Sequence, residues 1–286
     1  YEICACLVGS EMCIRDSGKK VLIANVLAEL VNAFKASGEK STLFYWVYAA
    51  AYMLHVYFDF SGYSDMAIGL GSIFGFTFPE NFNYPYIAAS ITEFWRRWHM
   101  SLSSWFRDYV YIPLGGSRVK RPRALLNIAI VWMLTGLWHG ADWNFVMWGI
   151  MFAALLIAEK TLLLGFIKKH RAIGHIYTLL FVMLCFIMFD ASGVKEGFET
   201  IAALFGANAA DNTEALYYLR SYAVPLTVAA LGATPLPKRI KAKLEATRIG
   251  GAIMAIAEPV ALAALLCLCT AYLIDGSFNP FLYFRF

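Results

Sequence analysis

The chain has 286 residues, of which 60% are hydrophobic, 16% aromatic and 15% charged. Soluble domains have about 45–50% apolar and about 25% charged residues, so this composition excludes an ordinary soluble protein and indicates an integral membrane protein. The net charge of +4 does not indicate nucleic-acid binding, because the basic residues form short clusters between apolar runs, as in the cytoplasmic loops of membrane proteins.

The first 17 residues, YEICACLVGSEMCIRDS, differ in character from the rest of the chain. No basic stretch precedes their short apolar run, so they are not a signal peptide, and there is no initiator methionine. They resemble translated adapter or junction sequence. We therefore predict a non-native segment at 1–17 and a membrane domain at 18–286, the C-terminal part of a longer protein.

Apolar runs long enough to cross a bilayer recur along the remaining residues. The segment 21–34 is apolar at near-helical spacing but short, which favours an interfacial or peripheral helix. Three basic clusters, near 118–123, 168–171 and 238–248, fall on one side of the predicted bundle, and the positive-inside rule makes that side cytoplasmic. A span needs about 20 mostly apolar residues. The predicted spans are 41–59, 124–139, 143–165, 175–191, 216–235 and 250–274, with a less hydrophobic one at 62–77.

Between about Phe76 and Arg123 the apolar pattern is interrupted. Prolines, adjacent arginines and a histidine occur there among aromatic residues, and no clean run of 18 apolar residues remains. Irregular backbone at membrane depth is tolerated only where protein buries it or water lines it. We therefore predict short helices and re-entrant segments packed inside the bundle.

His139 is the first candidate for chemistry, in the stretch LTGLWHGADWNF. A helix that starts beside the basic 118–123 loop places it roughly 22 Å along, inside a hydrocarbon core about 30 Å thick. An ionisable group at this depth indicates a functional site, and imidazole is a common general base. The alternative is a structural histidine bonded to a backbone carbonyl. Asp142 either orients His139 or, as we favour, caps the next helix.

His99 is the second candidate, in EFWRRWHMSLSSWFRD. On a helix, Arg96 and Ser103 would share its face. The alternative is an interfacial amphipathic helix with an aromatic belt and snorkelling arginines.

Two carboxylates lie in the apolar stretch YFDFSGYSDMAIGLGSIFGF. Asp59 and Asp65 are six residues apart and do not share a helical face, so spacing does not indicate an acid/base pair. We predict a helix break at Ser61-Gly62 capped by Asp59, with His55 as a hydrogen-bonded neighbour of Asp59.

Other motifs narrow the class of protein. The six cysteines show neither a C-x-x-C pair nor zinc-ligand spacing, and no phosphate-binding loop or hydrolase signature occurs. We therefore predict no metal site and no bound cofactor. We predict that His170 and His175, in or beside a basic loop, are solvated.

Several long motifs occur together in one order and resemble the membrane-bound O-acyltransferase (MBOAT) family, in the branch of the bacterial alginate O-acetyltransferase membrane component. The resemblance implies an all-α integral membrane fold, a polytopic helical bundle with re-entrant or short helices around a central funnel. The motifs are YFDFSGYSDMAIGLG, NFNYPYIAASITEFWRRWHMSLSSWFRDYVYIPLGGSR, WMLTGLWHGADWNFVMWG and the closing PFLYFRF.

The resemblance also assigns roles to residues. His139 matches the catalytic histidine of the family, and His99 matches its second signature histidine. The arginines beside His99 would orient the donor or the acceptor, or only anchor the helix at the cytoplasmic interface. The candidate substrate-binding residues are Arg96, Arg97, Trp98, Trp138 and Asp65.

The activity implied is acyl transfer in a multi-pass protein of the bacterial inner membrane. An acetyl group would move from acetyl-CoA or another cytoplasmic thioester towards hydroxyls of an alginate-like extracytoplasmic polysaccharide, directly or through a periplasmic SGNH-type O-acetyltransferase. The expected partners are thus the lipid bilayer, the polysaccharide and that enzyme, and no nucleic acid. The alternative function is a conduit for acyl groups, with the chemistry on a partner protein.

Overall fold

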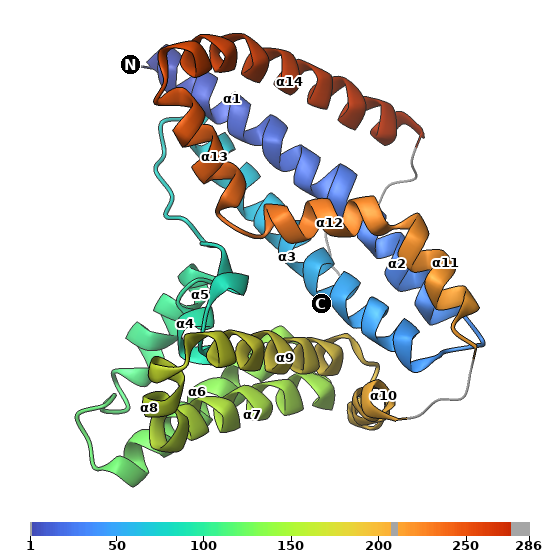
Figure 1. The fold of residues 1–286 in the computed structure, drawn as a ribbon. Helices are drawn as coiled ribbons and strands as arrows, with labels where there is room; N and C mark the ends of the chain where they lie inside the picture. The colour runs from blue at the N-terminus through green and yellow to red at the C-terminus, as the bar shows by residue number, and fades with distance from the viewer. Residues whose placement is uncertain (1, 207–210, 276–286) are drawn as a thin grey trace. The chain divides into compact units, whose positions relative to one another are not determined.

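The computed structural model describes residues 2–206 and 211–275, and throughout these ranges the secondary structure is helical, with no strand. The all-α prediction is therefore confirmed, whereas the arrangement around a central funnel stays a prediction. The closing motif PFLYFRF lies outside the described residues. The chain forms two compact units, both drawn in Figure 1.

The first unit includes residues 2–36, 51–81 and 217–275. Within it α1 packs along α14, and α2 contacts α12. A π-helical turn, η1, joins α1 to α2. Its helices are α1 (Glu2–Gly18), η1 (Lys19–Ala24), α2 (Asn25–Ala36), most of α3 (Thr42–Ile73), the end of α11 (Thr213–Ser221), α12 (Ala223–Gly232), α13 (Leu236–Glu245) and α14 (Arg248–Asp275).

Helix α3 corrects two predictions. It runs without interruption from Thr42 to Ile73, so 41–59 and 62–77 are one helix and the break at Ser61-Gly62 is wrong. Asp59 lies inside the helix, where its carboxylate accepts from Lys20 Nζ at 2.5 Å instead of capping a terminus. His55 Nδ1 lies 2.9 Å from the carbonyl oxygen of Ala24.

The short apolar segment near residue 21 folds as η1 and α2. Leu27 and Leu30 are fully buried, because the apolar face of α2 packs within the first unit. The helix expected there is present and its apolar face meets protein, whereas its interfacial or peripheral position stays a prediction.

The second unit includes residues 37–50, 82–206 and 211–216, the last of which contain the start of α11. The predicted short helices between residues 76 and 123 are confirmed as η2, α4, α5 and η3. Its elements are the start of α3, η2 (Pro85–Ile87), α4 (Ile91–Trp95), α5 (Met100–Phe106), η3 (Arg107–Tyr111), α6 (Arg121–His139), α7 (Trp143–Ala158), η4 (Glu159–Leu163), α8 (Leu164–Lys169), α9 (Arg171–Asp190) and α10 (Val194–Phe205).

Helices α6 and α7 pack closely because two glycines lie at their interface. A Cβ on Gly136 would lie 2.4 Å from the carbonyl oxygen of Phe145, and one on Gly149 would lie 2.3 Å from that of Trp132. Small residues at such positions allow backbones to approach in membrane helix pairs. This approach sets the distance between the end of α6 and the middle of α7.

Three helical stretches of the described chain are long and apolar enough to cross a membrane: Trp143–Lys169, Arg171–Asp190 and Arg248–Asp275. They correspond to the spans predicted at 143–165, 175–191 and 250–274. The span predicted at 216–235 is wrong as one helix, because α11 ends at Ser221 and α12 begins at Ala223. Pro225 lies in the first turn of α12, where a missing N–H is tolerated. The positive-inside orientation stays a prediction.

Candidate active site

His139 ends α6 inside a group of aromatic rings. Its imidazole is 4.9 Å from the ring of Trp138, 5.0 Å from that of Trp148 and 5.1 Å from that of Phe189, in edge-to-face arrangements. Aromatic rings favour this geometry, and each pair adds about 0.5–1.5 kcal/mol. The contacts come from α6, α7 and α9, so three helices together fix this ring.

His99 precedes α5 in a left-handed backbone conformation, with φ of 43°. A residue with a β-carbon rarely adopts this conformation, and such outliers gather at functional sites. The side chain is buried, and Ser101 Oγ lies 3.4 Å from its Nδ1. Its ring centre is 6.2 Å from that of Trp138.

Trp138 therefore contacts both histidines. His99 and His139 are 40 positions apart in sequence, yet the second unit brings both to one indole ring. Trp138 is itself 45% exposed, so part of its ring is available to a ligand. The structure thus joins the two predicted histidines and one of the predicted substrate-binding residues in one place.

Trp98 has a different environment. It is only 5% exposed, with its ring stacked on Phe94 at 5.5 Å and edge-to-face with Phe82 at 5.0 Å. These contacts make Trp98 part of the packing around α4. Its role in substrate binding stays a prediction.

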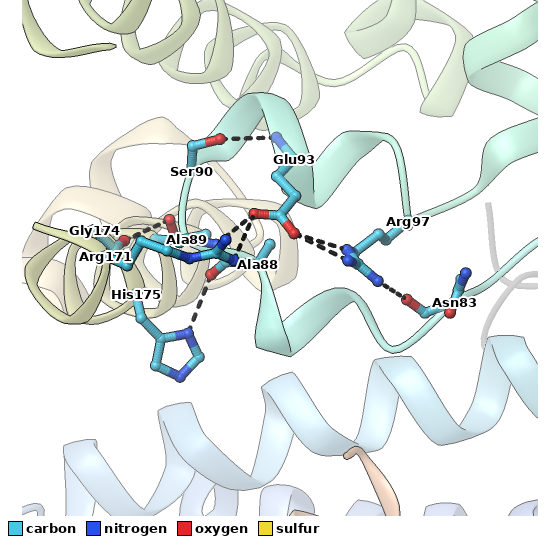
Figure 2. A network of polar contacts seen from close by, with 10 residues as sticks. Asn83, Ala88, Ala89, Ser90, Glu93, Arg97, Arg171, Gly174 and His175 are labelled. Carbon is cyan, nitrogen blue, oxygen red and sulfur yellow. Dashed lines mark hydrogen bonds and ion pairs between the residues drawn. The ribbon is translucent and has the colours of Figure 1, made fainter. Parts of the chain in front are cut away.

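The two adjacent arginines differ in their partners. Arg97 bonds Glu93 Oε1 through Nε at 3.2 Å and Nη2 at 3.0 Å, and its Nη1 donates to the carbonyl oxygen of Asn83 at 3.1 Å (Figure 2). Arg96 is exposed, and no ion pair or hydrogen bond involves its side chain within the described residues. Arg97 is thus neutralised internally, whereas Arg96 keeps its charge for an external group.

Glu93 is the centre of the network in Figure 2. Burial opposes its ionisation, but hydrogen bonds from the Ala89 N–H and from Arg97, with Arg171 at 4.0 Å, hold the pKa of Glu93 below its usual value. The network connects the segment before His99 to the start of α9. His175 adds a second connection, because its Nδ1–H donates to the carbonyl oxygen of Ala88 at 3.1 Å. His175 is therefore half-buried and only partly solvated, whereas His170 is exposed, as predicted.

Asp65 and Asp142 complete the predicted set. Asp65 belongs to the first unit, where its carboxylate accepts from Lys19 Nζ at 2.6 Å; its substrate-binding role stays a prediction. Asp142 occupies the N-cap position of α7, as favoured, but its side chain makes no capping hydrogen bond and is exposed. The Phe145 N–H donates instead to the backbone carbonyl of Asp142.

Two residues near the site were missed by the sequence reasoning. Asn144 donates to the carbonyl oxygen of Ala191 at 2.7 Å and to that of Phe189 at 3.3 Å, which fixes the residue whose ring packs on His139. Glu159 is buried and bonded to the start of α4. A single acidic residue inside an apolar run was a usable signal for Glu159, because buried charge at membrane depth is costly.

Within the described ranges, no group of three His, Cys, Asp or Glu side chains is placed to hold a metal ion.

Comparison with known proteins points to the same family as the motifs. A model of the MBOAT, membrane-bound O-acyltransferase family, matches residues 21–194. The chain is 39% identical over 298 residues to "Probable alginate O-acetylase AlgI" of Azotobacter vinelandii, an alignment that covers 94% of this chain and 60% of that relative.

Other relatives are named for other polymers and match shorter stretches of the chain. The chain is 36% identical over 195 residues to the peptidoglycan O-acetyltransferase of Helicobacter pylori, covering 66% of this chain and 37% of the relative. It is 40% identical over 117 residues to the teichoic acid D-alanyltransferase of Bacillus subtilis. That alignment covers 38% of this chain and 30% of the relative. The chain spans about 60% of the length of the Azotobacter relative. His99 and His139 both fall inside the range matched by the family model.

Proposed function

We propose, from the premise that the chain belongs to the membrane-bound O-acyltransferase family, that it carries the acyl-transfer site of a membrane O-acyltransferase. The proposed reaction moves an acetyl group from a cytoplasmic thioester to hydroxyls of an extracytoplasmic polysaccharide. The observation that carries the proposal is the meeting of His99 and His139 at Trp138.

His139 is the proposed general base. The described contacts of its ring are with aromatic rings on α6, α7 and α9, and packing of this kind fixes the ring plane while leaving proton transfer to the nitrogen atoms. The acceptor O–H bond breaks as its proton passes to the imidazole, and a new C–O ester bond forms. The thioester C–S bond then breaks, and the proton leaves with the thiol. General-base help of this kind contributes about 10²–10⁴-fold.

His99 and Arg96 are the proposed donor-orienting groups. His99 contacts Trp138 from the segment before α5, and Arg96 precedes it by three residues with an unneutralised charge. A guanidinium pairs well with phosphate oxygens, which acetyl-CoA carries. This assignment favours Arg96 over Arg97, because Glu93 already binds Arg97.

The acceptor is proposed to be an alginate-like polysaccharide. The relative that covers most of the chain is named for alginate O-acetylation, and the others are named for peptidoglycan and teichoic acid. All three are extracytoplasmic polymers that carry hydroxyl groups. The proposal includes an inner-membrane location, and the acetyl group reaches the polymer either directly or through a periplasmic SGNH-type enzyme.

The test replaces His139 by Gln in the full-length protein, expressed with its partners, and measures O-acetyl groups on the exported polymer per unit of membrane-inserted protein. We expect a fall of about 10² or more, because the general base is lost. Arg220→Gln, on α11 in a part of the chain with no proposed role, serves as the control. Acetylation at the wild-type level in the His139 variant would overturn the proposal.

The same variant separates the proposal from the conduit alternative. Release of free thiol from the donor by purified protein requires chemistry on this chain and should fall with polymer acetylation. If thiol release persists at the wild-type rate while polymer acetylation stops, cleavage of the thioester does not need His139, and the conduit alternative, in which another protein acetylates the polymer, is favoured.

A further inference from the structure

Glu159 is a buried acidic residue that the proposed reaction does not use. It is 1% exposed and lies at the start of η4, where the helix that begins as α7 changes to π-helical hydrogen bonding. Single π-helical turns are rare and occur often at functional sites. A carboxyl group in such a place is costly unless hydrogen-bond donors compensate it.

Among the described residues, the donors that compensate Glu159 come from two consecutive positions. The Ile91 N–H donates to its Oε1 at 2.5 Å, while the Thr92 N–H at 3.0 Å and the Thr92 hydroxyl at 2.7 Å donate to its Oε2. Both carboxylate oxygens are used, although Glu159 and Ile91 are 68 positions apart. A side chain of one long helix therefore fixes the first residues of α4.

The fixed residues lead directly to His99. From Ile91, α4 continues to Trp95, whose ring packs against Trp132 at 4.5 Å and Phe152 at 4.9 Å. Four residues later the chain takes the left-handed conformation at His99. Ring packing resists separation but allows sliding, since dispersion contacts have little direction. Hydrogen bonds have preferred distances and angles, so those of Glu159 can set the position of α4 along its axis.

We infer that Glu159 is a positioning residue, whose carboxylate fixes α4 so that the imidazole of His99 stays beside Trp138 during acyl transfer. The inference rests on the proposed function for the role of His99. It makes a separate claim about structure: without the Glu159 carboxylate, His99 moves while His139 does not. His139 is held by α6, α7 and α9 through ring contacts that do not involve Glu159.

The test uses Glu159→Gln and Thr92→Val in the full-length protein. Glutamine keeps the size of the side chain but offers one acceptor oxygen, and its NH₂ group faces an N–H donor. Valine keeps the shape of Thr92 and removes only the hydroxyl donor. Glu199→Gln on α10 is the matched control, because Glu199 is exposed and paired only with Lys195, at 3.8 Å, among the described residues.

Two quantities are measured for each variant. The first is the rate at which diethyl pyrocarbonate modifies His99 and His139, followed peptide by peptide with mass spectrometry. The second is polymer O-acetylation per unit of membrane-inserted protein. Global damage to the fold would raise modification at both histidines, whereas a change in positioning raises it at His99 alone.

We expect Glu159→Gln to raise modification of His99 several-fold, leave that of His139 unchanged and lower acetylation about tenfold, which corresponds to about 1.4 kcal/mol. Thr92→Val should act in the same direction by about threefold and should add little in the Glu159→Gln background, because the two side chains interact directly. Glu199→Gln should match wild type.

Unchanged modification of His99 in both variants would overturn the inference, and so would faster modification of His99 with full acetylation. If Glu159→Gln does not fold, Thr92→Val decides by the same two measurements. A failure of the proposed function has another signature, in which the His139→Gln protein retains acetylation whatever the Glu159 variants do.

Discussion

The two histidines at Trp138 are held in place by different physical means. His139 is fixed by rings on three helices. His99 is fixed through a short segment whose backbone is bonded by Glu159 and Glu93 and whose own conformation is left-handed. One position depends on helix spacing and the other on a set of directed polar contacts.

Because of this difference, different structural changes should displace the two histidines. A change in the separation of α6 and α7 should disturb His139 first, because its ring contacts Trp148 across that interface. A change in charge near α4 should disturb His99 first. Single substitutions can therefore act on one histidine and spare the other.

Among substitutions that leave both histidines in place, the largest effect is expected from forcing α6 and α7 apart. Gly149→Ala places a methyl group 2.3 Å from the carbonyl oxygen of Trp132, so the helices must separate. Overpacking of this kind costs about 1–3 kcal/mol, and we expect a lower thermal midpoint together with at least about tenfold less acetylation.

Gly165→Ala is the matched control for that substitution. A Cβ on Gly165, in α8, meets no atom within 4 Å, and alanine favours helix by up to about 1 kcal/mol relative to glycine. Its thermal midpoint should be unchanged or slightly raised. Equal effects of the two alanines on stability and acetylation would contradict the role given to the close approach of α6 and α7.

Smaller effects are expected from substituting the two arginines, on protein stability for Arg97 and on donor binding for Arg96. Arg97→Gln removes the partner of Glu93 and should destabilise the second unit by about 1 kcal/mol, as for other partly exposed ion pairs. Arg96→Gln should leave the thermal midpoint unchanged and raise KM for the thioester donor about tenfold, because it removes one charge-assisted hydrogen bond. The reverse pattern in melting curves and donor kinetics would mean that Arg97 contacts the donor.

The smallest effect is expected from lowering the pH, which should weaken the hydrogen bonds of Glu93. The pKa of Glu93 lies below its usual value in the folded protein, so its contribution to stability is present above the ordinary glutamate pKa of about 4.3. That contribution is lost as pH falls through the lowered pKa. The protection of residues 83–97 against hydrogen exchange, relative to the intrinsic rate at each pH, should therefore fall below about pH 4.3. In Glu93→Gln this protection should already be lower at neutral pH and should change little with acid. An equal acid response in that variant would assign the effect to another group.

Much of the fold could be predicted from the sequence, because long apolar runs have few alternatives to a helix. The spans near residues 143, 175 and 250 were found in this way, and so were the short helices around His99. The continuity of α3 was not, since Ser61 and Gly62 are ordinary helix-ending residues. Tertiary contacts keep that helix continuous: a Cβ on Gly62 would lie 3.4 Å from Lys19 Cβ.

The candidate site was predictable in its residues but not in its assembly. The motifs pointed to His99 and His139, but composition offered no means to place them beside Trp138. The choice between Arg96 and Arg97 required the position of Glu93, which shares a helical face with Arg97 at four-residue spacing. Glu159 required a contact across 68 positions, which a single sequence does not reveal.

The central claim is that acyl transfer takes place where His99 and His139 meet, and single-turnover thiol release tests it most directly. Purified full-length protein in lipid is mixed with acetyl-CoA and acceptor, and free thiol is followed in the wild type, His139→Gln and Glu199→Gln. We expect release to be about 10²–10⁴-fold slower in His139→Gln alone. Release at the wild-type rate in His139→Gln, with the protein folded and inserted, would contradict it.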